Sequence, residues 1–343
     1  MTTFTRSVTV TFLFVTFALA TGCGEDDSPG EPTPVVLHPE CTKSPTARVD
    51  AHTPQSQVDD WGPPIRLGSP INTLCPEDAI EISGDGQYLY FMFSSDRLED
   101  LTPAQILARS NNTYRAQRSG GPGDFMLPVY YDLAKGVTTG SLDGELSFSP
   151  DGGKVYFHSN RASNLGYQAS PPTDDYIDIY VADVVDGLAG PATNLGPPVN
   201  SVYPDGEHAL HPDGVSLYFA SRRPDNSLGG VDIWVSTLTD SGWTEPVNPG
   251  TPVNSIFDEL QPTFTPDGDT MYFTSDRNIL IGAAIYRTVR TGGIWGTPEL
   301  TISGIVGEAS LTTDGQLLYF VHVLSDTGGT FDADIWYCER VEP

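Results

Sequence analysis

The composition of this 343-residue chain favours an all-β fold and excludes nucleic acid as a direct ligand. Glycine occurs 35 times and proline 29 times, and aromatic residues make up 10% of the chain, a mixture that suits many short strands joined by tight turns. The formal net charge of −28 gives a surface that repels nucleic-acid phosphates and anionic lipid headgroups. We therefore expect no nucleic-acid partner, and contact with a membrane only through an anchor.

The first 23 residues carry a clear export signal. A positive start containing Arg6 precedes the apolar stretch Val8–Ala20, which is long enough for a signal-peptide core and too short to span a bilayer. The stretch ends in Leu-Ala-Thr-Gly-Cys, which resembles the lipobox of bacterial lipoproteins. The resemblance implies that residues 1–22 are removed and that Cys23 carries several acyl chains, which together hold a protein firmly on a membrane. We expect a lipid-anchored envelope protein on either side of the outer membrane, with ordinary secretory cleavage as the alternative.

Residues 23–57 predict a flexible tether, because they are rich in Pro, Ser, Thr, Asp and Glu and show little apolar periodicity. Beyond Cys23 the chain has three cysteines, Cys41, Cys75 and Cys338. An exported protein can form one disulfide among them and keep one thiol. The position of Cys338 near the closing strand makes Cys41 a geometrically plausible mate, and the pairing stays open.

From about residue 58 the chain repeats one phrase five times, an Asp-Gly pair followed by an apolar-Tyr-Phe triplet. The pairs are Asp85-Gly86, Asp151-Gly152, Asp213-Gly214, Asp267-Gly268 and Asp314-Gly315. Asp-Gly favours a tight hairpin turn, and the triplet favours a strand. Third strands such as Asp232–Trp234 and fourth strands such as Trp243–Val247 complete the unit. Four antiparallel strands repeated five times predict an all-β, five-bladed propeller.

The two ends of the repeat region predict how the ring closes. The first recognisable strand, Trp61–Ile65, matches the fourth strand of a unit, whereas the chain stops after a third strand at Asp334–Val341. The N-terminal strand should therefore complete the last blade and leave no sheet edge exposed. This makes one domain, residues 58–341.

Two insertions interrupt the repeats, at Leu98–Asn111 and Ala162–Asp175. The first is expected to hold a helical turn over Thr102–Ala108. The loop Tyr167–Tyr176 is either a specificity element or a surface elaboration. The recurring tryptophans and Tyr-Phe pairs are expected to pack between blades, because they occupy matching repeat positions.

The repeats are similar to the WD40-like repeats of TolB-type propellers, whose unit reads Ser-Pro-Asp-Gly, an apolar strand, Ser-Asp/Asn-Arg and Asp-Ile-Tyr. The arginine phrase ends at Arg97, Arg161, Arg223 and Arg277. Blade five departs from it with Val321-His322-Val323. The resemblance implies a fold rather than a function, since such repeats occur in adaptors, in enzyme gating domains and in stand-alone lipoproteins.

Acidic residues recur on the first strand of the units, at two fixed distances before the Asp of the turn. Eight residues before it stand Glu77, Asp143, Asp205, Glu259 and Val306. Six residues before it stand Ala79, Glu145, Glu207, Gln261 and Glu308. Side chains two residues apart lie on one side of a strand, so we expect both sets to form one acidic collar near the channel entrance. Antiparallel geometry places the four arginines on the same face.

Two interpretations of the collar can coexist. In the structural one, each Arg bridges carboxylates within or between blades. In the functional one, blade five lacks its Arg, and the surplus acid leaves a site for a cation or a basic peptide. Calcium is the ion that several carboxylate oxygens would suit, and we expect no other cofactor.

A glycoside hydrolase is the catalytic alternative. Five-bladed propellers include such enzymes, which place an acid and a nucleophile or base across the central funnel. Glu145, Glu207 and Glu308 are the candidates, although acids that recur in every repeat are typical of architecture. His208 and His211 lie three residues apart on one expected strand, face opposite sides and cannot bind a metal together.

The sequence therefore predicts a non-enzymatic, monomeric envelope lipoprotein. Its propeller would bind a protein, peptide or envelope polysaccharide on the face that carries the collar and the insertions. An envelope spacer with no specific ligand is the third possibility.

Overall fold

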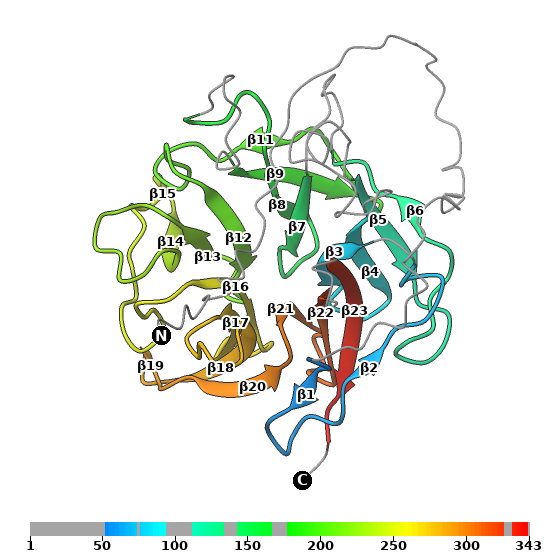
Figure 1. Cartoon of the computed structure of the whole chain (residues 1–343). Coiled ribbons are helices and arrows are strands. Elements are labelled where there is room, and N and C mark those ends of the chain that lie inside the picture. The colour runs from blue at the N-terminus through cyan, green and yellow to red at the C-terminus, as the bar shows by residue number, and fades with distance from the viewer. Residues whose placement is uncertain are drawn as a thin grey trace, which may run out of the picture.

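The computed structural model of this protein describes residues 52–73, 76–93, 112–133, 143–166, 177–325 and 331–341. All regular elements in these ranges are strands, which form five antiparallel sheets around a common axis (Figure 1). The predicted all-β, five-bladed propeller is confirmed. No helix in the described ranges could span a membrane. The predicted features that lie outside them are Cys23, Cys41, Cys75, Arg97, the helical turn at 102–108 and the loop 167–176.

Each blade starts next to the axis and proceeds outwards in chain order. The innermost strands are β3 (Glu77–Ile82), β7 (Asp143–Phe148), β12 (Asp205–Leu210), β16 (Glu259–Phe264) and β21 (Val306–Leu311). The second strands are β4 (Tyr88–Phe93), β8 (Lys154–Ser159), β13 (Ser216–Ser221), β17 (Thr270–Ser275) and β22 (Leu317–Ser325). The third strands are β5 (Asn112–Gln117), β9 (Asp178–Val185), β14 (Asp232–Thr239), β18 (Ala284–Thr291) and β23 (Phe331–Glu339). Short outer strands are β6 (Val129–Tyr130), β10 (Leu188–Ala189), β11 (Thr193–Asn194), β15 (Gly242–Trp243), β19 (Ile294–Trp295) and β20 (Glu299–Ser303).

The Asp-Gly pairs turn the innermost strand of each blade into the second. In blade one, Asp85 Oδ1 accepts hydrogen bonds from Ser83 Oγ at 2.6 Å and from the Gln87 amide at 2.9 Å. Gly86 follows with φ at 69°, in the left-handed region that glycine adopts without a steric cost. All five turns therefore lie at one end of the innermost strands, which we call the turn side.

The N-terminal strand closes the ring as predicted. β2 (Ile65–Arg66) pairs antiparallel with β23, and Trp61 forms an isolated bridge with Arg340. Arg66 also donates to both carboxylate oxygens of Asp334, at 2.8 and 2.6 Å. The closing strand is thus fixed by an ion pair as well as by backbone bonds.

A second N-terminal strand lies beyond the one that the sequence indicates. β1 (Gln55–Ser56) pairs with β20 at the outer edge of blade four. These residues belong to the segment assigned to the tether, so ordered structure begins before residue 58. The chain then crosses from blade four to blade five, and Figure 1 shows β1 and β2 on either side of β23.

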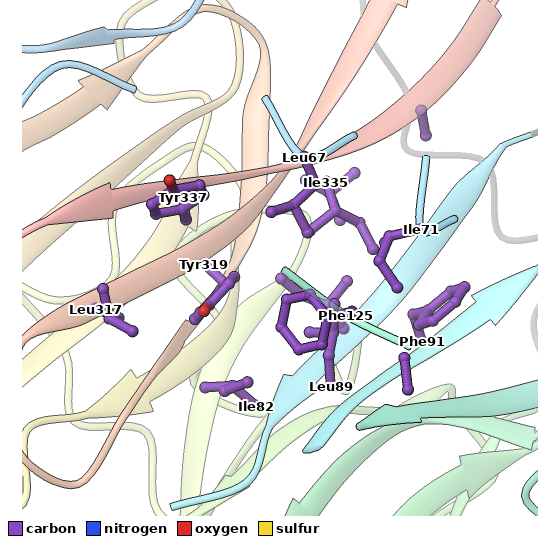
Figure 2. Packing of buried hydrophobic residues seen from close by; sticks show 14 residues of the cluster. Leu67, Ile71, Ile82, Leu89, Phe91, Phe125, Leu317, Tyr319, Ile335 and Tyr337 are labelled. Atoms are coloured by element: carbon purple, nitrogen blue, oxygen red, sulfur yellow. The ribbon is translucent and has the colours of Figure 1, made fainter. Parts of the chain in front are cut away.

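Hydrophobic side chains fill the space between neighbouring blades. Between blades five and one, Leu67 and Ile335 pack with Phe91 and Leu89, and all four are at most 1% exposed (Figure 2). Complete burial of one such side chain stabilises a fold by roughly 1.5–3 kcal/mol. The junction between the last and the first blade is therefore a packed core.

The tryptophans pack across blade junctions, as predicted. The ring centroid of Trp243 in blade three lies 6.4 Å from that of Tyr156 in blade two, edge to face. Trp295 in blade four lies 6.4 Å from Tyr218 in blade three with the same geometry. Aromatic pairs at such distances attract each other beyond the area that they bury.

Candidate functional site

Among the described residues, three of the acids that stand eight residues before the turn make ion pairs with the arginines: Asp143, Asp205 and Glu259. Asp205 Oδ2 accepts from the amide and the hydroxyl of Ser201, at 2.6 and 2.7 Å. Its Oδ1 accepts from Arg223 Nη2 at 2.5 Å, and the same guanidinium donates to the Val199 carbonyl at 2.6 Å. The Arg223 guanidinium also lies over the rings of Phe219 and Trp234.

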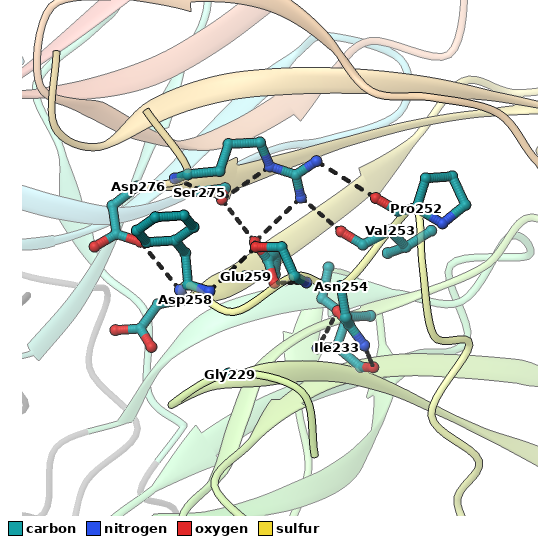
Figure 3. A network of polar contacts seen from close by, with 12 residues as sticks. Gly229, Ile233, Pro252, Val253, Asn254, Asp258, Glu259, Ser275 and Asp276 are labelled. Atoms are coloured by element: carbon teal, nitrogen blue, oxygen red, sulfur yellow. Dashed lines mark hydrogen bonds and ion pairs between the residues drawn. The ribbon is translucent and has the colours of Figure 1, made fainter. Parts of the chain in front are cut away.

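Blade four repeats this arrangement around Glu259 (Figure 3). Glu259 accepts from Ser255, from Ser275 Oγ at 2.8 Å and from Arg277 Nη2 at 3.1 Å. Arg277 Nη2 also donates to the Val253 carbonyl at 2.6 Å. The Arg side chain thus ties the loop before the innermost strand to the loop after the second strand.

Blades two, one and five complete the pattern. Arg161 pairs with Asp143 at 3.0 Å. In blade one, Glu77 accepts from the Thr73 amide and hydroxyl, whereas its predicted partner Arg97 lies outside the described residues. In blade five, Val306 replaces the acid and faces His322 across the strand pair. Arg161, Arg223 and Arg277 thus each pair with the carboxylate of their own blade, which is the arrangement that the structural interpretation of the Arg phrase expects.

The residues that stand six positions before the turn, three of which are acids, have different surroundings. Their backbones are left-handed, with φ between 46° and 56°. The residues are Ala79, Glu145, Glu207, Gln261 and Glu308. At each of them the pairing with the second strand shifts register, as at a β-bulge. A bulge breaks the period-two alternation on which the single collar was predicted, so the collar divides into two sets.

The second set forms a ring around the propeller axis, joined from blade to blade. Gln261 Nε2 donates to Glu308 Oε1 at 3.2 Å, and the Glu308 amide donates to Gln261 Oε1 at 3.1 Å. Glu308 Oε2 in turn accepts from the Ile80 amide at 3.4 Å. Glu145 hydrogen-bonds Glu207 on the other side of the ring.

Blade one contributes Asp78 to this ring, a residue that sequence reasoning missed. Blade one has Ala79 where three other blades have Glu, and Asp78 stands directly before it. The Asp78 carboxyl hydrogen-bonds Glu308. Its side chain is exposed, and this contact with buried Glu308 places the exposure inside the channel. We call Asp78, Glu145, Glu207, Gln261 and Glu308 the axial ring.

Burial and mutual repulsion keep the axial ring partly protonated. Burial, then the charges of Glu207 and Asp78, raise the pKa of Glu145 well above its usual value. Burial, then Asp78 and Glu145, do the same to the pKa of Glu308. Burial also raises the pKa of Glu207 to about 7. Protonated Glu145 and Glu308 can therefore donate to Glu207 and Asp78.

A cavity of about 750 Å³ lies on the turn side of the ring. Glu145, Gln261 and Glu308 line its inner end, and residues of the Asp-Gly turns line its mouth. Glu81 lines the wall between them, where its Oε2 accepts from Ser310 Oγ at 2.7 Å. The cavity therefore opens away from the ion pairs of the arginines.

Glu81 is the second acid that sequence reasoning missed. The matching positions of the other blades hold Ser147, Ala209, Thr263 and Ser310, so Glu81 breaks the repeat. Burial raises the pKa of its carboxyl to about 8. A comparison of the blades for residues that differ, rather than for residues that recur, would have found it.

Two buried histidines lie beside the ring. Burial lowers the pKa of His158 to about 3 and that of His208 to about 4, so both are neutral at pH 7. Among the described residues, neither ring nitrogen of His208 has a hydrogen-bond partner, and His208 lines the cavity. His211 belongs to other surroundings, where its Nε2 lies 3.1 Å from the Gly268 carbonyl. Within the described ranges no group of three or more His, Cys, Asp or Glu residues is arranged to hold a metal ion.

No protein-family model and no curated protein matches the chain. Solved structures, however, do match it. A structure titled "Glycoside hydrolase" superposes with a TM-score of 0.54 at 12% identity, covering 82% of this chain and 92% of its own. A structure of BT0996 in an RGII complex has a TM-score of 0.51 at 12% identity, covering 84% and 92%. A TolB-like protein from Agrobacterium tumefaciens is 16% identical with a TM-score of 0.38, covering 79% and 92%.

These likenesses concern the fold. The chain is a five-bladed β-propeller. Glycoside hydrolase and TolB-like structures are both among its neighbours, and at such identities neither transfers an activity.

Proposed function

We propose that this protein is a non-enzymatic binding module of the bacterial envelope, anchored through lipid on Cys23. Its cavity would accept a positively charged segment of a protein, a peptide or an envelope polymer. The observation that carries this proposal is the convergence of five carboxyl groups, four in the axial ring and one at Glu81. In the described part of the chain, no Lys or Arg pairs with these five.

A cation would relieve an unfavourable arrangement. Burial removes water from the ring carboxyls, and ionised neighbours repel one another. Both effects raise the pKa of Glu145 and of Glu308. A bound positive charge favours the ionised form, so binding should release protons. Affinity for a cation should therefore rise as the pH rises through about 7 and about 8, the pKa values of Glu207 and Glu81.

The mouth of the cavity would attract such a ligand from solution. Asp85 and Asp151 lie at the mouth, and hydrogen bonds from Ser149 and Gly153 lower the pKa of Asp151. The lowered pKa favours the charged form of Asp151. The lining also holds Asp186 and one cation, Arg115, which donates to the Gly187 carbonyl, so acidic side chains outnumber basic ones. Such an excess of one sign of charge raises the local concentration of oppositely charged ligands, an effect that salt screens.

The test compares fluorescently labelled basic, neutral and acidic peptides of equal length by anisotropy, with the full mature chain in detergent. The basic peptide should bind, and more tightly at pH 9 than at pH 6. The double variant Glu145→Gln and Glu308→Gln keeps the shape of the protonated ring but removes two of its four ionisable groups, so it should bind the basic peptide much more weakly. Asp240→Asn, on an outer hairpin of blade three, removes a charge without touching the cavity and should bind like the parent. Equal binding of all three peptides would contradict the proposal.

A glycoside hydrolase is the second candidate, and Glu81 is the observation that favours it. Active sites break repeat symmetry, and a carboxyl that is still protonated near neutral pH suits a general acid. Glu145 or Glu308 in the same cavity would be the second carboxyl. Turnover of a glycan that is lost in Glu81→Gln would establish the enzyme. If the parent protein cleaves none of a panel of envelope glycans, the result favours the binding module over the enzyme.

A further inference from the structure

We propose that the cavity recognises a flexible aliphatic chain that carries primary ammonium groups, with one ammonium at the axial ring and a second beside Glu81. Free linear polyamines carry such groups on one chain, and two neighbouring lysine side chains of a peptide present the same pair of primary ammonium groups. The inference rests on the proposed function and narrows it from any cation to one class.

The acids of the cavity occur at successive depths along its axis. The ring lies at the level of Glu308, and Glu81 lies at the level of Ser310, its hydrogen-bond partner two residues further along β21. A strand rises about 3.3 Å per residue and a bulge shortens it, so the two levels are roughly 5–7 Å apart. This separation suits ammonium groups joined by three to five methylene groups. The rim acids Asp85 and Asp151 form a third level.

The ring geometry favours ammonium over guanidinium. An ammonium group has three donors that fan out around one axis, whereas guanidinium is a flat fork that matches the edge of a single carboxylate. Carboxyls contributed by four blades surround the propeller axis. An ammonium on that axis could donate to three of them at once. A guanidinium would donate hydrogen bonds to one carboxyl and leave the other ring carboxyls without a bond to the ligand.

Two buried side chains, one in the ring and one beside it, have acceptor atoms without a hydrogen-bond partner in the part of the chain that the structure describes. Glu207 is 8% exposed, and its Oε2 is buried without a partner. His208 is 4% exposed, has no partner at either ring nitrogen and lines the cavity. A neutral imidazole offers one acceptor nitrogen. Burying unsatisfied polar atoms costs free energy, and a donor on the ligand would recover it.

The wall between the two levels is suited to methylene groups. Ile80, Leu146 and Ala309 line the cavity and are at most 7% exposed. An aliphatic chain that spans the levels would therefore contact apolar side chains while its two ends contact acids. Rigid or heavily hydroxylated cations would lack this match.

The experiment is isothermal titration calorimetry of the full mature chain in detergent at pH 8.5, with amines that differ in number and spacing of ammonium groups. The probes are butylamine, ethylenediamine, putrescine and spermidine. Putrescine and spermidine should bind at least about tenfold more tightly than butylamine, which has the same chain and one ammonium. Ethylenediamine should bind weakly, because its two nitrogens are too close to reach both levels and hold little more than one positive charge between them at this pH. Heats measured in two buffers of different ionisation enthalpy should reveal proton release.

Glu81→Gln separates the two levels. The amide keeps an oxygen that can accept from Ser310, so the fold should be retained, and a circular dichroism melt checks this. Loss of one charged contact should weaken putrescine by roughly tenfold and leave butylamine unchanged. Asp240→Asn should bind every amine like the parent. A putrescine affinity that Glu81→Gln leaves unchanged would overturn the two-level assignment.

Two further probes, a lysine-rich peptide and an arginine-rich peptide of equal length, identify the source of the ammonium groups. A lysine-rich peptide that binds while free polyamines do not would assign the site to lysine side chains, and the reverse would assign it to free polyamines. An arginine-rich peptide of equal length that binds as tightly as the lysine-rich one would overturn this inference and leave the proposed function standing. If no amine and neither peptide binds, both fall.

Discussion

At the scale of single residues, the two sets of acids show how one residue type serves two purposes. Asp205 and Glu259 are paired with Arg and bonded to loop amides, so they hold loops together. The acids of the axial ring face one another, and Glu145, Glu207 and Glu308 occupy a left-handed backbone, which costs roughly 1–2 kcal/mol for each non-glycine residue. The packed blade junctions offset the cost of this geometry.

Glu81→Gln should stabilise the protein at high pH. The pKa of Glu81 is raised from 4.5 to about 8, so its contribution to stability is fully present below about pH 4.5 and is lost as the pH rises through 8. Above that pH the parent holds a charged carboxylate in a poorly solvated place and Gln does not. Allowing for water in the cavity, we expect a gain of roughly 1–2 kcal/mol at pH 9 and none at pH 4. Urea unfolding at both pH values measures it, with Asp240→Asn as control.

Asp205→Asn should destabilise the protein strongly. The Asp205 side chain is fully buried and Arg223 is 12% exposed, so the variant leaves a mostly buried guanidinium without its counter-charge. We expect a loss of roughly 3 kcal/mol in the free energy of unfolding. Lys154→Ala removes the exposed pair with Asp183 and should cost no more than about 1 kcal/mol. Equal losses in the two variants would show that burial does not govern these ion pairs.

At the scale of elements, residues 55–62 join blade four to blade five. β1 pairs with β20, and Trp61 Nε1 donates to Tyr272 on β17 at 3.1 Å. Asp60 Oδ2 accepts from Arg287 of blade four at 2.6 Å and from Arg340 beside blade five at 3.1 Å. The N-terminal segment is therefore bonded to both blades between which it passes.

Asp60→Asn should loosen this connection. The variant removes one charged acceptor shared by two guanidinium groups, all partly buried, and should cost about 1–2 kcal/mol. Hydrogen exchange should show faster opening of β2 and β23 than of blades two and three. An unchanged urea midpoint together with unchanged exchange would contradict a role of Asp60 in closure.

The sequence predicts these elements where a pattern recurs and fails where a feature occurs once. The Asp-Gly turns and Tyr-Phe triplets recur in every blade, and each has a local physical cause, so blade number and closure by Trp61–Ile65 were predictable. β1 is two residues long and shows no periodicity. The bulges place Glu and Gln at positive φ, and these residue types do not predict such a backbone conformation. Asp78 and Glu81 break the repeat, so an alignment of repeats passes over them.

At the scale of the whole molecule, the two sides of the propeller differ in chemistry. The side with the Arg phrase holds carboxylates neutralised by ion pairs. The turn side holds the cavity, its uncompensated acids and a charged rim. A net charge of −28 surrounds both. A cationic partner would therefore be attracted to the molecule in general and held on the turn side.

Cys23→Ala should release the protein from membranes, because acyl chains on Cys23 are the expected attachment. Fractionation of cells that express the parent and the variant checks this, with Cys338→Ala as a thiol-loss control. Cys338 is buried inside the described domain and should leave the membrane fraction unchanged. A variant that stays in the membrane fraction would contradict the anchor.

The pairing of β1 with β20 also has a mechanical consequence. The chain enters the propeller at β1, so tension on the preceding segment acts first on two residue pairs at a sheet edge. If these two residue pairs separate, the tension acts next on Asp60 and Trp61. It then acts on β2, the strand that closes the ring. Tension on the N-terminal segment would thus separate β2 from blade five before it acted on the other blades. Blade five supplies Glu308 to the axial ring. Tension on the N-terminal segment would therefore act on the cavity through blade five before it acts on the other blades that line it.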